Sequence, residues 1–372
     1  MKWSWKLGEV SGIGVYVHAT FLLLIGWIAL SGWLDGGLPT ALDAVVFVLA
    51  LFACVVLHEF GHAFAARRYG ISTRDVTLLP IGGVARLERM PDDPRQEFWV
   101  ALAGPAVNVV IAIVLYAFLL VTGGLVPFSD FGFGEGSLAV RLLVTNITLV
   151  AFNLLPAFPM DGGRVVRALL AMRMDYLRAT QFAASLGQAM AFLFGFLGLF
   201  ANPFLLFIAL FVWMGAGQEA SAAQMRSNLG GIPVASAMLT EFHTLSPSDR
   251  LADAVRLILS GSQHDFPVVE DGEVVGVLTR HDLLMALSQN GQDWPVGEVM
   301  KRHFQTIDSA DMLETASQRL QECNCHTMPV VHNGQLVGLI TMENLGEYLM
   351  IQRALDKGRA RAAMARTHGP IL

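Results

Sequence analysis

VLHEFGHAFAARR, residues 56–68, decides how the first half of this chain is interpreted. The stretch places Glu59 and two histidines, His58 and His62, near the end of an apolar run that begins at Ala44. Ionisable side chains in a membrane-spanning segment are energetically expensive, and they usually serve a function. Histidines four residues apart stack one helical turn apart, so both imidazoles can bind one metal ion. Glu59 then points about 100° around the same turn, close enough to act as a general base.

The composition divides the chain into a membrane half and a soluble half. Hydrophobic residues make up 54% of the 372 residues and charged residues only 15%, which is far from the usual soluble mixture. Long charge-free runs occur up to about residue 218, and alternating apolar and charged positions follow Glu219. The net charge of −6 argues against a nucleic-acid partner. Three cysteines are too few for a disulfide framework, so we expect Cys323 and Cys325 to be core residues of a cytosolic part.

Hydropathy predicts six membrane-spanning helices, because a span needs roughly 20 apolar residues. The candidate runs are residues 10–34, 44–66, 98–121, 142–160 and 179–218, the last divided into two spans by Asn202-Pro203. With the N-terminus inside, the basic residues of the short loops fall on the cytoplasmic side, Arg141 excepted. Both termini are therefore expected in the cytoplasm. Residues 71–95 are too short and too polar to cross, and predict a β-hairpin or re-entrant segment lying in protein or at the interface.

A catalytic zinc site needs a third protein ligand and one open position. Asp161 is the best candidate, in NLLPAFPMDGGR at residues 153–164, because it lies at the cytoplasmic end of the fourth predicted span, at a depth similar to that of the histidines. Asp161 is the only carboxylate between Glu135 and Asp175. The two glycines after it predict a sharp backbone turn. The alternative is that Asp161 caps a helix at the membrane surface.

HEFGH, AGPAVN at residues 103–108 and NLLPAFPMDGG together resemble the signature elements of the site-2 protease family of intramembrane zinc metalloproteases, peptidase family M50, over about residues 10–225. The resemblance implies that His58, His62 and Asp161 bind zinc, that Glu59 is the general base, and that Asn153 steadies the scissile carbonyl. The implied substrate is a membrane protein with a transmembrane segment that unwinds locally, because a helical peptide bond is shielded by its own hydrogen bonds. The segment predicted between spans two and three could hold it as an added strand.

Three further polar residues have ordinary interpretations beside the functional ones. Asn108 is either a second donor to the developing oxyanion or an interhelical hydrogen bond. Cys54 shares a helix face with His58, and we expect it to be a small packing residue. For His18 we expect an interfacial or interhelical hydrogen bond.

The soluble half is an internal repeat. Residues 234–289 align without a gap with residues 296–351, which means two copies of one unit. Each copy predicts a helix, a strand, a tight turn at Asp271-Gly272 or Asn333-Gly334, a second strand and a final helix. This pattern resembles a tandem pair of CBS domains.

The CBS resemblance implies an adenine nucleotide of the ATP or AMP type between the copies. The family motif G-x-x-T-x-x-D is complete in copy one, with Gly276, Thr279 and Asp282. Copy two has Thr341 but carries Asn344 in place of the aspartate, which weakens the case for two equivalent sites. The alternative is a purely structural dimerisation module.

We therefore expect a membrane α-helical bundle of six transmembrane helices followed by a soluble α/β tandem CBS domain pair. The expected parts are the metalloprotease domain at 1–226, the CBS domains at 232–290 and 295–351, and a basic, Ala-rich helical tail at 352–372. The expected function is that of an intramembrane zinc metalloprotease of the cell membrane, with a regulatory CBS pair that could form a homodimer. A CBS-gated transporter or channel is the alternative, although an ion path does not need the HExxH arrangement. A catalytically inactive scaffold is less consistent, because every implied catalytic residue is present.

Overall fold

The computed structural model describes residues 3–80, 82–87, 90–91, 93–124, 136–323 and 325–367. The chain forms two compact units, Met1–Ala223 and Gln224–Leu372. It passes from one unit to the other within helix α6 (Phe204–Leu229). Each unit is described by itself below.

The first unit begins with strands where hydropathy predicts the start of a membrane span. Its sheet has the order β1 (Ser4–Val10), β2 (Ile13–His18), β3 (Thr73–Leu79), β4 (Gly82–Leu87). β1–β2 and β3–β4 are antiparallel hairpins, and β2 pairs with β3 in parallel. The β3–β4 hairpin is the one predicted within residues 71–95. The first predicted span therefore starts too early, because β2 places Ile13, Val15 and Val17 in the core with a period of two that averaged hydropathy does not separate from a helix.

The first long helix, α1, covers Ala19–Arg68 and contains the second predicted span and the part of the first that begins at residue 19. It is interrupted at Gly36 and Gly37, whose backbone angles are not helical. At its start, the Nδ1 atom of His18 accepts a hydrogen bond from the backbone N–H of Thr20. His18 is thus the N-terminal cap of α1, which satisfies one of the free N–H groups of the first turn.

The other helices of the first unit are α2 (Pro94–Thr122), α3 (Leu138–Asn153), α4 (Asp161–Ala171) and α5 (Tyr176–Phe200). The fourth predicted span, residues 142–160, is wrong in its second half. The helix ends at Asn153, and an irregular segment containing Pro156 and Pro159 follows, because proline cannot continue a helix. Helix α4 lies beyond this segment and is not among the predicted spans.

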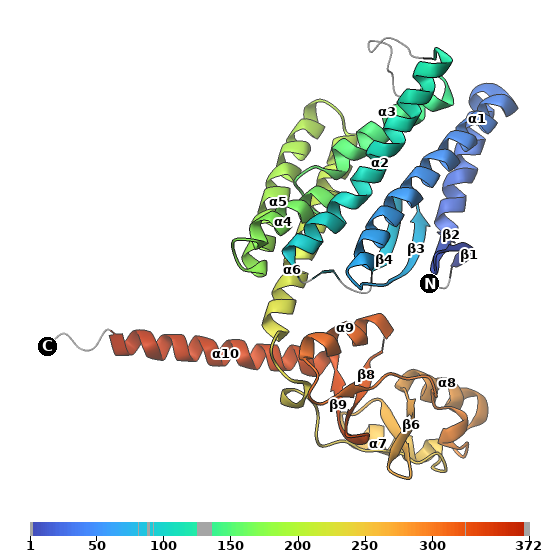
Figure 1. Cartoon of the computed structure of the whole chain (residues 1–372). Helices are drawn as coiled ribbons and strands as arrows, with labels where there is room; N and C mark the ends of the chain where they lie inside the picture. Colours follow the sequence, from blue (N-terminus) through green and yellow to red (C-terminus); the bar gives the residue numbers. More distant parts are fainter. Residues whose placement is uncertain are drawn as a thin grey trace. The chain divides into compact units, whose positions relative to one another are not determined.

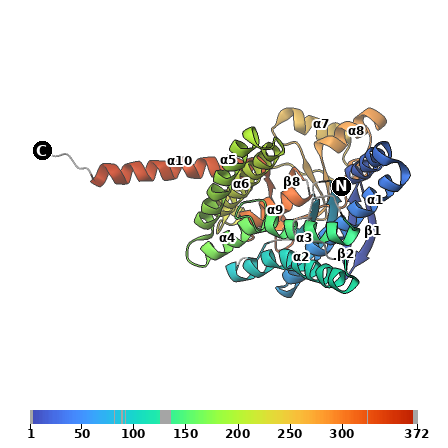
Figure 2. The ribbon, with the colours of Figure 1, turned by 90° about the horizontal axis from the view of Figure 1, so that it is seen from above.

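Among the residues that the structure describes, four helices are long and apolar enough to cross a membrane: α1, α2, α5 and α6. Helix α3 is apolar but shorter, with 16 residues. The predicted count of six spans is therefore not confirmed. Helix α2 packs against α1, α3 and α4, and the sheet packs on α1. Figure 1 shows the strands beside the lower part of α1, and Figures 1 and 2 both show α4, α5 and α6 grouped together.

The second unit repeats one set of elements twice, as the sequence predicts. Copy one contains α7 (Leu251–Ser260), β5 (Phe266–Glu270), β6 (Glu273–Leu278) and α8 (Arg280–Asn290). Copy two contains β7 (Ile307–Asp308), α9 (Leu313–Cys323), β8 (Thr327–His332), β9 (Gln335–Thr341) and α10 (Met342–Thr367). Both hairpin turns have two residues with positive φ, Asp271-Gly272 and Asn333-Gly334, as expected for these dipeptides.

The two copies exchange the segments that lead into them, which the repeat alone does not reveal. The short helix η2 (Val234–Ser236) precedes copy one, yet Val234 packs in the core of copy two beside Leu313. Conversely, η3 (Val296–Glu298) precedes copy two, and Val296 packs in the core of copy one beside Leu251. The two copies therefore fold together, because the core of each contains a segment that precedes the other.

Cys323 and Cys325 pack against the core of copy two, as expected, but they form a disulfide with each other. Cys54 is free and buried. Helix α10 runs into the predicted tail as far as Thr367, and residues 368–372 of that tail lie outside the described residues. Figures 1 and 2 show α10 projecting beyond the strands of its own unit.

Candidate metal centre

Three buried side chains from distant parts of the first unit meet at one point. His58 and His62 lie on α1, and Asp161 is the first residue of α4. The two Nε2 atoms are 3.1 Å apart, and Asp161 Oδ2 lies 3.3 Å from His58 Nε2 and 3.2 Å from His62 Nε2. The three residues are 6%, 5% and 8% exposed. Within the described part of the chain, this is the cluster whose ligand atoms could all reach one ion.

Hydrogen bonds on the far side of each imidazole select the nitrogen that faces the cluster. His58 Nδ1 bonds to the side-chain oxygen of Asn108, and His62 Nδ1 lies 2.7 Å from the backbone oxygen of Val100. A carbonyl oxygen can only accept, so both Nδ1 atoms carry the hydrogen. The Nε2 lone pairs are then free to bind a metal ion.

Asn108 is itself held by a second amide that sequence reasoning missed. Asn108 Nδ2 donates to Asn146 Oδ1 at 2.8 Å, and Asn146 Nδ2 donates to the Leu142 backbone oxygen at 2.8 Å. Both amides are fully buried. Of the two alternatives for Asn108, the structure therefore shows the interhelical hydrogen bond. The side-chain oxygen of Asn108 faces His58, a predicted metal ligand. The available signal for Asn146 was a lone amide inside the apolar run LLVTNITLV.

Gly104 of the AGPAVN motif keeps the space between the ligand atoms open. A Cβ atom added there would lie 2.2 Å from His62 Nε2 and 2.7 Å from His58 Nε2. Zinc binds imidazole nitrogen at about 2.0–2.1 Å, so a side chain at this position would compete with the metal for the same volume. Two imidazoles, one carboxylate and this open volume fit a zinc ion with a position left for water.

Glu59 is next to the cluster but outside it. One oxygen of its carboxylate, Oε2, accepts a hydrogen bond from the backbone N–H of Ala85 at 3.1 Å. Ala85 lies in β4, the terminal strand of the sheet. The general base implied by the sequence is therefore anchored on the β3–β4 hairpin.

The glycines after Asp161 act differently from the prediction. Gly162 and Gly163 lie in the first turn of α4 and neither has a positive φ, so the predicted sharp turn is wrong. An added Cβ would lie 2.2 Å from the Leu155 backbone oxygen at the first glycine and 2.6 Å from the Phe158 nitrogen at the second. The glycines allow the segment after α3 to fold back onto the start of α4. Asp161 is not the cap of α4, since Met160 takes that position.

Asn153 is the last residue of α3 and is half-buried. It stands directly before the irregular segment that leads to Asp161. The structure records no hydrogen bond for its side chain among the described residues, so its role stays a prediction.

In the second unit, the predicted nucleotide residues lie at the starts of two equivalent helices, α8 and α10. Thr279 Oγ1 donates to Asp282 Oδ2 and accepts from the Asp282 backbone N–H. Thr341 and Asn344 make the same two contacts in copy two. Lys301 Nζ lies 3.2 Å from Asp282 Oδ2, which brings a positive charge beside this motif.

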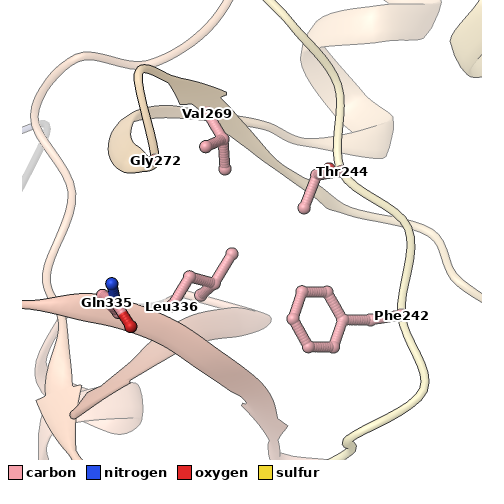
Figure 3. A pocket seen from close by; sticks show the side chains of 6 residues that line it. All are labelled: Phe242, Thr244, Val269, Gly272, Gln335 and Leu336. Carbon is pink, nitrogen blue, oxygen red and sulfur yellow. The ribbon is translucent and has the colours of Figure 1, made fainter.

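A cavity of about 310 Å³ lies between the two copies (Figure 3). Its lining comes from Phe242, Thr244, Val269 and Gly272 of copy one and from Gln335 and Leu336 of copy two. The lining contains none of the predicted nucleotide residues, Thr279, Asp282 and Thr341.

The comparisons with known proteins agree with both halves of this description. The profile of Peptidase family M50 matches residues 46–138 and 136–197, and the CBS domain profile matches 234–289 and 296–351. A zinc metalloprotease of Methanocaldococcus jannaschii, MJ0392, is 31% identical over 346 residues, covering 93% of this chain and 96% of that protein. Rip3 of Mycobacterium tuberculosis is 28% identical over 377 residues, covering 95% and 94%. A solved site-2 protease from Methanocaldococcus jannaschii is 35% identical and covers 59% of this chain and 95% of its own, with a TM-score of 0.44.

Proposed function

The chain belongs to peptidase family M50 and is a zinc metalloprotease of the site-2 protease type with a tandem CBS pair, and from this we propose that it cuts a peptide bond in or near a transmembrane segment of a membrane protein. The observation that carries the proposal is the buried cluster of His58, His62 and Asp161 in a unit built of apolar helices. The alternative of a transporter or channel is not supported, because the relatives along nearly the whole chain are metalloproteases.

Each of the predicted site residues has its own role in the proposed peptide hydrolysis. His58 and His62 would hold zinc through Nε2, and Asp161 would hold it through its carboxylate. When bound, zinc supplies Lewis-acid activation of a water molecule and of the scissile carbonyl. Glu59 accepts the proton of the attacking water and passes it to the leaving amine. Asn153 donates a hydrogen bond to the carbonyl oxygen as negative charge develops there.

Strand β4 gives an extended substrate a place next to the general base. It is the terminal strand of the sheet, and among the described residues no strand pairs with its outer edge, where a substrate strand could be added. The backbone N–H of Ala85 in β4 donates a hydrogen bond to Glu59. A transmembrane segment unwound along this edge presents its backbone to Glu59.

We assign the six predicted spans to the two arms of α1 and to α2, α3, α5 and α6, with both termini in the cytoplasm. The proposed parts remain the metalloprotease domain at 1–226, the CBS domains at 232–290 and 295–351, and the tail. The CBS pair regulates the protease through α6, the helix in which one unit passes into the other. It also provides the surface for homodimerisation.

For the nucleotide, Thr279 and Asp282 hold the ribose in copy one and Thr341 provides the corresponding hydroxyl in copy two. Support comes from Lys301, whose ammonium beside Asp282 suits a phosphate group. The Asp-to-Asn difference at Asn344 predicts tighter binding at copy one.

Glu59→Gln tests the proposed mechanism. The purified full-length variant, reconstituted in liposomes with a model single-span substrate, is expected to retain zinc and to lose cleavage, because the amide cannot accept the proton. Metal content by mass spectrometry and product formation by gel are the two measurements. The control is Glu9→Gln, which changes an exposed carboxylate of the same unit. Loss of zinc in Glu59→Gln would reassign this residue as a ligand, and unaltered cleavage would contradict the mechanism.

A further inference from the structure

Arg167 is a charged side chain buried at the junction of three helices. It lies on α4 and is 2% exposed. Its Nε and Nη2 atoms contact Glu97 Oε1 on α2 at 2.7 and 2.5 Å, and its Nη1 atom contacts Glu219 Oε2 on α6 at 2.8 Å. The guanidinium also lies 5.0 Å from the ring centre of Phe158 and 5.2 Å from that of Tyr176.

This ion network is not explained by stability alone. One guanidinium faces two carboxylates, and Glu97 is only 1% exposed. The second oxygen of Glu97, Oε2, is buried without a hydrogen-bond partner among the described residues. Removing charges from water costs about as much as a buried ion pair returns, so apolar residues of similar volume often stabilise a protein better. A planar guanidinium that binds two acids in a fixed fork instead defines geometry.

The geometry that Arg167 defines is that of the helices around the metal centre. Helix α4 begins with Asp161, six residues before Arg167, a rise of about 9 Å along one short helix. Helix α2, which carries Glu97, also carries the Val100 oxygen that orients His62 and the Asn108 side chain that orients His58. Anchoring Arg167 to α2 therefore sets the rotation of α4, and with it the direction of the Asp161 carboxylate toward the two imidazoles.

We propose that Arg167 is a positioning residue of the metal centre, acting through α4 on Asp161, with Glu97 as the main anchor and Glu219 as the second. The inference rests on the proposed role of His58, His62 and Asp161 as zinc ligands. It assigns a function to a charge that the hydrolytic chemistry itself does not use.

The test separates positioning from simple support of the fold. Arg167→Met keeps an unbranched side chain but leaves Glu97 buried and unpaired, so it is expected to lower both thermal stability and zinc affinity. The double variant Arg167→Met with Glu97→Gln removes the unpaired charge. It is expected to regain much of the thermal stability of the zinc-free protein while its zinc affinity remains about 10- to 100-fold below that of the wild type. Arg178→Met, at an exposed arginine on α5, is the control.

Zinc affinity is measured by competition with a chromophoric chelator, and the ligand geometry by the visible absorption of the Co²⁺-loaded protein. With the model membrane substrate, the Arg167 variants are expected to have a lower kcat and little change in KM. Recovery of both stability and zinc affinity in the double variant would overturn the proposal, because Arg167 would then only support the fold.

Glu219→Gln decides the question if the double variant does not fold. It keeps the Glu97 pair and weakens the second anchor by removing its charge, so zinc affinity is expected to fall by less than in Arg167→Met, with an altered Co²⁺ spectrum. Unchanged affinity and spectrum would overturn the proposal. Wild-type protein that binds zinc but does not cut a membrane substrate would contradict the proposed function alone, because the zinc measurements need no substrate.

Discussion

The metal centre and the CBS pair both bring distant segments together, but the first does so through hydrogen bonds and the second through apolar packing. At the metal centre, polar atoms from α1, α2 and α4 meet through individual hydrogen bonds in a buried space. In the CBS pair, exchanged apolar side chains such as Val234 and Val296 fill two equivalent cores. A buried polar site depends on each partner, whereas an apolar core loses stability in proportion to what is removed. Substitutions should therefore impair zinc binding in the first region and produce graded stability losses in the second.

The largest effect is expected from Gly104→Ala. The added methyl would lie within about the length of a zinc–nitrogen bond of His62 Nε2, so the protein should bind no detectable zinc and cut no substrate. Metal content of the purified protein is the measurement. Gly26→Ala on α1, where an added Cβ meets nothing within 4 Å, is the control. Normal zinc content in Gly104→Ala would show that the metal lies elsewhere.

Asn108→Ala should weaken zinc binding by about 10- to 100-fold, because His58 loses the acceptor that orients its ring. Asn146→Ala should have a smaller effect in the same direction, since it acts on His58 only through Asn108. Chelator competition measures both. Equal losses in the two variants would mean that the amides simply pack the helices together.

In the CBS pair, Asp265→Ala should cost about 1–3 kcal/mol of stability and leave zinc binding unchanged. Asp265 is 5% exposed and accepts hydrogen bonds from the Arg280 N–H at 2.8 Å and the Thr327 hydroxyl at 2.9 Å, so its loss leaves two partly buried donors without their acceptor. Hydrogen exchange of the full chain should show faster exchange confined to the second unit. Asp293→Ala, at an exposed carboxylate, is the control. A simultaneous loss of zinc would contradict the separation of the two regions.

The smallest effect is expected from the two matched helix caps, Thr279→Ala and Thr341→Ala. Each removes a hydroxyl that accepts from the first turn of a helix, worth about 1 kcal/mol. The repeat predicts similar losses of protection in α8 and α10 by hydrogen exchange. A clear difference between them would show that the copies are not energetically equivalent.

The parts of this protein that the sequence predicts best are those that depend on local pattern. The repeated turns Asp271-Gly272 and Asn333-Gly334 require positive φ, and the structure has it. The Ile71–Arg95 region forms the expected hairpin because its strands are neighbours in the chain. Hydropathy was less reliable, since β2 has no Asp, Glu, Lys or Arg and runs directly into the apolar start of α1, whereas α4 is too polar to resemble a membrane helix.

The sequence by itself determined the chemistry and the local elements: the residue types and spacing of His58, Glu59 and His62, and the two copies of the CBS unit. Only the tertiary structure decided what surrounds them. The amide chain from Asn146 to His58, the open space at Gly104, the Arg167 network and the exchanged CBS segments all join residues far apart in the chain. Such contacts depend on the relative positions of whole helices, which no local periodicity encodes, so they become visible only when the helices are packed.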